Sequence, residues 1–194
     1  MESTDNNKML IKDIERFKKV NNNYHRLLIR YFITTNSIRA IFFYRFLNKQ
    51  NTKNTKISKM IFKIIFYLSF IINELEIPYT AKIGDGLLIP HPKCIFIHSK
   101  SIIGKNVTIG QGVTIGGNIY KTKNGRRSPT IGDNVLIGAG AMVLGPVHVG
   151  DNSIIGANAV IIKDVPKDSV AVGVPAKVVK KVDENYYKIM KKNQ

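Results

Sequence analysis

Residues 131–162, IGDNVLIGAGAMVLGPVHVGDNSIIGANAVII, decide the fold of this chain. An aliphatic residue stands at every sixth position of this stretch, at Ile131, Ile137, Val143, Val149, Ile155 and Ile161. Gly follows four of these positions, at Gly132, Gly138, Gly150 and Gly156. A period of six matches neither the helical period of about 3.6 residues nor the strand period of 2. It predicts a short strand followed by a tight corner, repeated along the chain.

Three such units close a triangular coil of about 18 residues, and coils stack at about 4.8 Å, the spacing of neighbouring strands. The aliphatic side chains then point inward, and Gly or Asn at the corners tolerates positive φ. The pattern therefore predicts a parallel β-helix. An earlier array, at Ile77, Ile83 and Ile89, is out of register by two with the array that begins at Ile97. The shift predicts two extra residues in one coil, around residues 91–94.

The array is interrupted by residues 116–130, GGNIYKTKNGRRSPT, which lack the six-residue pattern. Their polar, basic and glycine-containing composition predicts a loop that leaves the coil. Such an excursion from a repeat array is a common position for function. Pro166 and Pro175 mark the end of the repeats, and residues 183–192 are expected to form a short helix over the last coil edge.

The first 75 residues have helical rather than six-residue periodicity. Helices are expected over residues 8–20, 24–48 and 57–75, so that the chain divides into a helical region 1–75, a β-helix 76–182 and a tail 183–194. One interpretation packs the helices on the β-helix or on sister subunits. The other attaches them to the inner face of a membrane, because apolar residues interspersed with Lys and Arg suit an interfacial helix.

The net charge of +17 is spread evenly, with +8 in residues 1–80 and +9 in residues 81–194. An evenly spread excess of positive charge does not indicate one localised basic groove that binds nucleic acid, so no nucleic-acid partner is expected. It suits anionic substrates or an anionic surface, and an AT-rich genome is an equally simple source of the lysines. The single Cys94 excludes an internal disulfide, and no signal peptide or spanning helix is evident, which predicts a cytoplasmic protein.

His91 lies at the register shift, where a side chain need not point inward. A neutral imidazole is a natural general base for a hydroxyl, and Glu76, fifteen residues earlier, is about one coil away. The residues alone leave a structural histidine open. No metal site is expected, because the histidines lack ligand spacing, and His98 and His148 are assigned to surface corners.

Several small and basic residues are candidate contacts for a polyanionic ligand. Solvated charge and tight coil packing are the simpler interpretations of the same residues. The candidates are Gly117, Gly138, Ala139, Gly140, Ala141, Lys121, Lys123, Arg126, Arg127, Lys177, Lys180 and Lys181.

Four motifs of this chain resemble the hexapeptide acyltransferases, and within them the serine O-acetyltransferase branch. These are EIPYTAKIGDGLLIPH, NVTIGQGVTIGG, PTIGDNVLIGAGAMVLG and DVPKDSVAVGVPAKVV. The resemblance implies a left-handed β-helix, a homotrimer, acetyl-CoA as donor, and active sites between neighbouring subunits. It also assigns Glu76 and His91 to the catalytic acid and histidine of that branch.

Two departures bear on the acceptor. Pro90 stands where the branch has Asp before its catalytic His, and Arg127-Ser128-Pro129 replaces an Arg-His-Pro triplet. In the branch, that Asp and His help to hold the amino acid, and the isoleucine tail that grips cysteine synthase is also missing here. The departures favour acetylation of a glycan or lipid-linked glycan hydroxyl in surface polysaccharide biosynthesis. A serine O-acetyltransferase of cysteine biosynthesis and an inactive solenoid scaffold are the alternatives.

The expected mechanism is direct transfer. His91 takes the hydroxyl proton while the oxygen attacks the thioester, and Glu76 orients the imidazole and stabilises its cation. The Gly117 N–H is a candidate oxyanion donor. CoA is expected against Gly138, Ala139 and Ala141, with its phosphates near Lys177, Lys180 and Lys181, and the acceptor near Pro90, Arg127 and Ser128.

Overall fold

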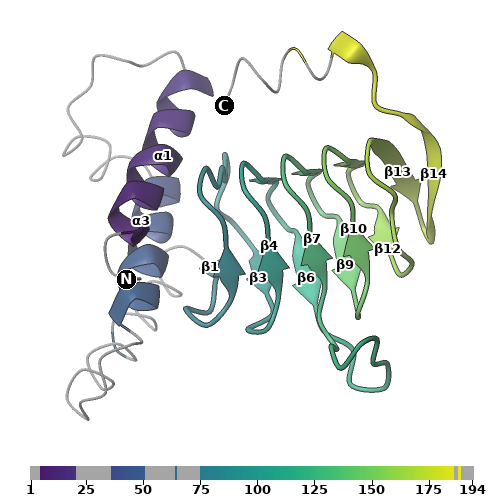
Figure 1. Cartoon of the computed structure of the whole chain (residues 1–194), viewed down its shortest axis with the longest axis horizontal. Coiled ribbons are helices and arrows are strands. Elements are labelled where there is room, and N and C mark those ends of the chain that lie inside the picture. The colour runs from purple at the N-terminus through teal and green to yellow at the C-terminus, as the bar shows by residue number, and fades with distance from the viewer. Residues whose placement is uncertain (1–4, 21–35, 51–63, 65–74, 186–187, 189–194) are drawn as a thin grey trace.

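The computed structural model describes residues 5–20, 36–50, 64, 75–185 and 188. Within them, two helices, α1 (Asp5–Val20) and α3 (Asn36–Gln50), precede a column of short strands (Figure 1). The strands form three sheets, here called faces A, B and C. Face A contains β1 (Leu75–Glu76), β3 (Ile95–Ile97), β6 (Thr114–Gly116), β9 (Met142–Leu144) and β12 (Val160–Ile161). Face B contains β2 (Lys82–Ile83), β4 (Ile102–Ile103), β7 (Thr130–Ile131) and β10 (His148–Val149). Face C contains β5 (Thr108–Ile109), β8 (Leu136–Ile137), β11 (Ile154–Ile155), β13 (Ser169–Gly173) and β14 (Ala176–Lys181).

The chain visits the faces in the order B, C, A, so the strands from β1 to β13 pair in parallel with the strand one coil away. The residues at every sixth position point into the prism, and those at Ile131, Ile137, Val143, Val149, Ile155 and Ile161 are at most 1% exposed. The fold is a left-handed parallel β-helix with an N-terminal helical region, which confirms the predicted fold class. Its core is one column of Ile and Val whose burial supplies most of the stabilisation of the coil.

The corner between faces B and C is held by a ladder of asparagines. Asn106, Asn134 and Asn152 have φ angles of 55°, 57° and 58°, which Asn tolerates better than other non-glycine residues. The Nδ2 of Asn106 donates to Asn134 Oδ1 at 3.2 Å, and Asn134 donates to Asn152 at 3.0 Å. Asn at this corner therefore serves both the backbone conformation and the stacking of coils.

The register of the strands locates the two irregular coils. Leu75 pairs with Ile95, twenty residues later, whereas Phe96 pairs with Thr114 at the regular eighteen. The first coil therefore holds the two extra residues that the register shift predicted. Thr114 pairs with Met142, twenty-eight residues later, so the segment between β6 and β7 adds ten residues to its coil. This segment projects from the side of the column, below β6 and β9 in Figure 1.

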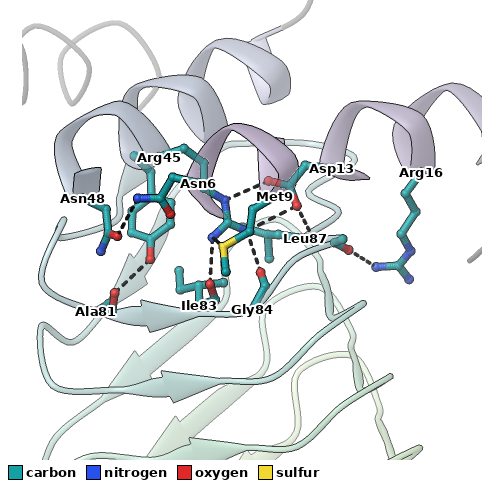
Figure 2. Close-up of polar contacts among 12 residues, drawn as sticks. Asn6, Met9, Asp13, Arg16, Arg45, Asn48, Ala81, Ile83, Gly84 and Leu87 are labelled. Carbon is teal, nitrogen blue, oxygen red and sulfur yellow. Dashed lines mark hydrogen bonds and ion pairs between the residues drawn. The ribbon is translucent and has the colours of Figure 1, made fainter. Parts of the chain in front are cut away.

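The helices α1 and α3 lie against the open edge of the first coil (Figure 1). Arg45 of α3 donates to the carbonyl oxygens of Ile83 at 2.7 Å and Gly84 at 2.5 Å, and Tyr44 donates to Ala81 O at 2.8 Å. Arg16 of α1 donates to Gly86 O at 2.5 Å. Figure 2 shows these side chains reaching from the helices to the coil backbone. They satisfy strand-edge carbonyls that would otherwise be unpaired.

A buried ion pair holds the two helices together at this edge. Arg45 Nε lies 2.9 Å from Asp13 Oδ2, with side chains 3% and 1% exposed (Figure 2). Asp13 Oδ1 also accepts the Leu87 N–H at 2.7 Å, so one carboxylate joins α1, α3 and the first coil. Burial raises the pKa of Asp13, while Arg45 opposes the rise, and burial raises the pKa of Tyr44 to about 12.

The opposite end of the column is closed by β14, which pairs antiparallel with β13. The edge was expected to be covered by a helix over residues 183–192, but a strand covers it. Glu184, Asn185 and Lys188 are helical and Asp183 is not, and residues 186–187 and 189–192 lie outside the described residues. The strand is explained by the turn at 173–175, where Gly173 has a φ of 94° and lets the chain fold back.

The N-terminal predictions are tested only in part. The predicted helix 8–20 begins earlier, at Asp5, and the predicted helix 24–48 is described only as α3, which begins at Asn36. The helix expected over 57–75 lies outside the described residues except at Ile64, which is helical, and at Leu75, where it is wrong. Leu75 belongs to β1 because it pairs with Ile95. Across the described ranges, none of the helices has the length and apolar character needed to cross a membrane.

Candidate active site

His91 lies in the expanded corner between faces C and A, four residues before β3. Its side chain is exposed, and its carbonyl accepts the Lys93 N–H at 2.9 Å. The same bend contains the exposed Pro90, whose carbonyl accepts the Ser37 hydroxyl at 3.4 Å, and Cys94 with a φ of 54°. The extra residues thus turn His91 outward, into solvent, at an edge of the prism.

Glu76 is the last residue of β1, on face A, where it pairs with Phe96 of β3. It is partly exposed, whereas its strand neighbour Leu75 is buried. The pairing of β1 with β3 brings Glu76 beside the strand that His91 leads into. Glu76 is therefore paired with Phe96, five residues beyond His91, in the coil that follows its own.

The corner that carries His91 continues along the whole column. The Gly112 N–H donates to Lys93 O at 2.9 Å, and the Gly140 N–H donates to Gln111 O at 2.7 Å. This corner, here called the CA edge, also carries Gly138 and Ala139, both partly exposed. A Cβ on Gly138 would lie 2.6 Å from the Ala157 nitrogen, so coil packing alone already requires glycine there.

Other residues expected to contact CoA are distributed between the surface and the core. Lys177, Lys180 and Lys181 are exposed on β14, at the far end of the column. Ala141 is 0% exposed and belongs to the core, so its side chain cannot form a wall for a ligand. It occupies an inward position of its coil, which its sequence neighbours Gly138 and Ala139 do not.

A cavity of about 530 Å³ opens at the other side of face A, at the corner between faces A and B, here called the AB edge. It lies where β3 and β6 end and the loop begins. Its lining residues are His98, Ser99, Lys100, Gly117, Asn118, Ile119, Gly125, Arg126, Arg127 and Ser128. The structure thus brings Gly117, Arg127 and Ser128 together, and separates them from His91 by the width of face A.

The loop that forms one wall of this cavity is itself folded. Lys123 and Arg126 exchange backbone hydrogen bonds at 2.9 and 3.0 Å, and Asn124 and Gly125 between them have φ angles of 50° and 72°. This is a two-residue hairpin, for which the Asn-Gly dipeptide is a strong sequence signal. The Lys123 side chain contacts Asp164, and this hydrogen bond lowers the pKa of Asp164.

Two side-chain donors of the loop bond to one carbonyl oxygen of the coil. Arg126 Nη2 donates to Lys100 O at 2.8 Å, and the Ser128 hydroxyl donates to the same oxygen at 2.7 Å. Ser128 is only 3% exposed, so its hydroxyl serves mainly to close the loop. Arg127 is exposed, and its Nε donates weakly to Thr122 at 3.4 Å. Its guanidinium is therefore accessible to a ligand in the cavity.

His98 is a cavity residue that the sequence assigned to an ordinary surface corner. Its ring lies against Gly117, where a Cβ would be 2.9 Å from both Cδ2 and Nε2. The Gly117 N–H has no hydrogen-bond acceptor among the described residues. No sequence signal marks His98, because the loop that makes it part of a cavity is twenty residues further along the chain. Among the same described residues, no cluster of His, Cys, Asp and Glu is suited to a metal ion.

Comparisons with known proteins show to which protein family this chain is similar. The model of the bacterial transferase hexapeptide (six repeats) matches residues 128–163. The serine acetyltransferase of Staphylococcus aureus strain Mu50 is 45% identical over 118 residues, 61% of this chain and 54% of that protein. A solved serine acetyltransferase in complex with CoA is 30% identical, with a TM-score of 0.76 over 89% of this chain and 68% of that chain. The Neisseria gonorrhoeae serine acetyltransferase in complex with serine is 28% identical, with a TM-score of 0.77 over 91% of this chain and 70% of that chain.

This chain therefore belongs to the hexapeptide-repeat transferase family, in its serine acetyltransferase-like branch. The overlays include more than the β-helix, because they cover 89% or more of the chain. The chain spans about half the length of the first curated relatives it matches, 47% and 54%.

The comparisons correct the predicted acceptor. A glycan hydroxyl was expected from Pro90 and Ser128, but the relatives in sequence and structure are serine acetyltransferases. The structure explains why the departure at Ser128 was weak evidence. Ser128 is committed to the carbonyl of Lys100, and the cavity beside it retains other polar donors from the coil and the loop.

Proposed function

We propose that this chain is an acetyl-CoA-dependent serine O-acetyltransferase. The observation that carries the proposal is the agreement of the two comparisons, because the sequence relatives and the structural neighbours are both serine acetyltransferases. The exposure of His91, at a corner where the coil departs from its repeat, supports a catalytic rather than a packing role for this residue.

In the proposed reaction, His91 accepts the proton of the serine hydroxyl as the oxygen forms its bond to the acetyl carbon. The bond between that carbon and the sulfur of CoA breaks, and the sulfur leaves with a proton returned by the imidazolium. Glu76 orients the ring and stabilises its positive charge. The Gly117 N–H, which has no acceptor within the described part of the chain, stabilises the oxyanion of the tetrahedral intermediate. The reaction needs no covalent enzyme intermediate.

The CA edge fits an extended, polyanionic co-substrate. Gly138 and Ala139 present no large side chain on this edge, in one of the coils between His91 and β14. Lys177, Lys180 and Lys181 on β14 supply positive charge for phosphates at the far end. We place the pantetheine arm of acetyl-CoA along this edge, with its thioester toward His91.

The proposed active unit is a homotrimer with its sites between subunits. Within one chain, His91 on the CA edge and the cavity on the AB edge lie on opposite sides of face A. A complete site therefore requires the CA edge of one subunit to meet the AB edge of the next. Face A also exposes Phe96 and Met142, at 38% and 42%, in one outward ladder. Burial of this ladder against neighbouring subunits would stabilise such an assembly.

On the acceptor side, we place the serine between His91 of one subunit and the cavity of its neighbour. The exposed guanidinium of Arg127 is the natural partner for the carboxylate of serine, because Arg binds carboxylates in a bidentate manner. Pro90 borders the hydroxyl end of the serine as the residue before His91, and Ser128 holds the loop in place.

The proposal is tested with the purified full-length chain. Release of free thiol from acetyl-CoA is followed with and without L-serine, and the product is identified by mass spectrometry. We expect turnover that depends on L-serine and yields O-acetylserine. Thiol release that is no faster with L-serine than in the blank without acceptor would contradict the proposal.

A further inference from the structure

We infer that His98 is a specificity-determining residue, which donates a hydrogen bond from its Nε2 to the carboxylate of the acceptor in the AB-edge cavity. The inference rests on the proposed function for the identity of the acceptor. It concerns a residue outside the His91–Glu76 pair, on the opposite edge of face A.

The backbone fixes which ring nitrogen of His98 carries the proton. The Lys100 N–H donates to His98 Nδ1 at 3.2 Å. A nitrogen that accepts a hydrogen bond carries no proton, so the neutral ring has its proton on Nε2. His98 is therefore a donor at the one ring nitrogen that its own backbone turn leaves available.

That nitrogen lies beside the backbone of Gly117. The position of a Gly117 Cβ would be 2.9 Å from His98 Nε2, so any other residue at 117 would displace the ring. The Gly117 N–H also lacks an acceptor among the described residues. The Nε2–H that we assign to the carboxylate thus lies beside the Gly117 N–H that the proposed mechanism assigns to the oxyanion.

The remaining lining of the cavity is suited to an anion. None of its ten described lining residues is acidic, whereas Lys100, Arg126 and Arg127 are basic. The Nε of Arg126 is buried without a hydrogen-bond partner in the described part of the chain. A buried donor without an acceptor is costly, so a bound anion or water is expected nearby. A carboxylate is the acidic group that a serine acceptor provides.

The role of His98 predicts a substrate-dependent defect. His98→Asn places an amide near the Nδ1 position and removes the Nε2–H, whereas His98→Gln extends an amide donor toward the Nε2 position. Hydrogen bonds to charged groups contribute about 1.5–3 kcal/mol, so we expect His98→Asn to raise KM for L-serine about 10- to 100-fold. His98→Gln should retain KM within a few-fold of the unmodified chain.

L-Serinamide, which lacks the carboxylate, separates carboxylate recognition from general damage. KM for L-serinamide should be the same in the unmodified chain and in His98→Asn. His148→Asn, which changes an exposed histidine outside the lining of this cavity, is the matched control and should leave both KM values unchanged. An unchanged KM for L-serine in His98→Asn, or equal losses on both acceptors, would overturn the inference.

A binding measurement keeps the inference testable if the chain does not acetylate serine. Two-bond 1H–15N spectra of the 15N-histidine-labelled chain should show His98 protonated at Nε2, and its signals should shift with glycine but not with ethanolamine. Such shifts without serine turnover would refute the proposed function and support the anion site. An Nδ1-protonated ring, or no response to glycine, would refute the role of His98 whatever the reaction is.

Discussion

At the scale of single residues, His91 owes its exposure to the two extra residues of the first coil. In a regular coil, each residue points into the core column, points outward from a face, or lies at a tight corner. The twenty-residue spacing between Leu75 and Ile95 relaxes this rule at one corner only, and His91 lies there. The irregularity therefore frees an imidazole at the surface without loss of core packing, since Ile89 and Ile95 on either side are buried.

His91→Ala is expected to lower kcat about 100- to 10,000-fold, the usual contribution of a general base. Because the side chain is exposed, the thermal unfolding midpoint and the Kd for CoA, measured by calorimetry, should stay close to those of the unmodified chain. His148→Ala provides the control for loss of an exposed imidazole. A kcat within a few-fold of normal for His91→Ala would rule out its role as the base.

At the scale of elements, the helices α1 and α3 act as a polar cap on the first coil. Their arginines bond to coil carbonyls, and Asp13 bonds to both Arg45 and the Leu87 N–H. Asp85, at the edge of this cap, contacts Lys12. Burial opposes ionisation of Asp85, but the hydrogen bond and charge of Lys12 outweigh it and lower the pKa of Asp85. The cap therefore combines a fully buried pair with a partly exposed one.

Arg45→Met is expected to lower the free energy of unfolding by about 3–5 kcal/mol, because it leaves the buried Asp13 without its partner. Lys123→Met is the matched control. It breaks an ion pair whose side chains are 54% and 46% exposed, and should cost about 1 kcal/mol or less. Urea denaturation followed by circular dichroism measures both variants. Equal, small losses would show that the cap contributes little to the stability of the coil.

At the scale of the whole molecule, two edges of one prism carry complementary halves of the proposed site. The CA edge provides His91 and the small residues Gly138 and Ala139, which lie between His91 and the lysines of β14. The AB edge provides the cavity and its loop. Face A between them exposes an apolar ladder. In the proposed homotrimer, rotation of identical chains about a common axis would bring these two edges together.

Met142→Glu is therefore expected to weaken the trimer, because it places a charge in the centre of the exposed ladder on face A. Sedimentation velocity should show a trimer for the unmodified chain and lighter species for the variant, with a parallel loss of serine acetylation. Ile102→Glu, on face B beside Lys82, is the control and should remain trimeric. An unaltered sedimentation coefficient for Met142→Glu would contradict an interface on face A.

The β-helix, its irregular first coil and its loop could be predicted from the sequence, because a coil contacts only its neighbours. Its inward residues therefore recur at a fixed spacing that the chain itself displays. For the same reason, the sequence predicts which residues lie one coil apart, such as Glu76 and the strand that follows His91. The fold class, the two extra residues and the inserted loop can all be predicted from the spacing of the inward aliphatic residues.

Only the tertiary structure decided which residues outside the repeat come together. Asp13 and Leu87 are separated by 74 residues, and no periodicity relates a helix to the coil edge it covers. His98 looked like a corner histidine until the loop at Gly117 and Arg126 closed a cavity over it. Ala141 looked like a groove residue until its place in the coil put it in the core. In a repeat, residues that contact each other are separated by a fixed number of positions, so the sequence predicts their contacts. The helical cap, the cavity and the proposed acceptor contacts join residues at irregular separations, so the spacing of residues does not predict them.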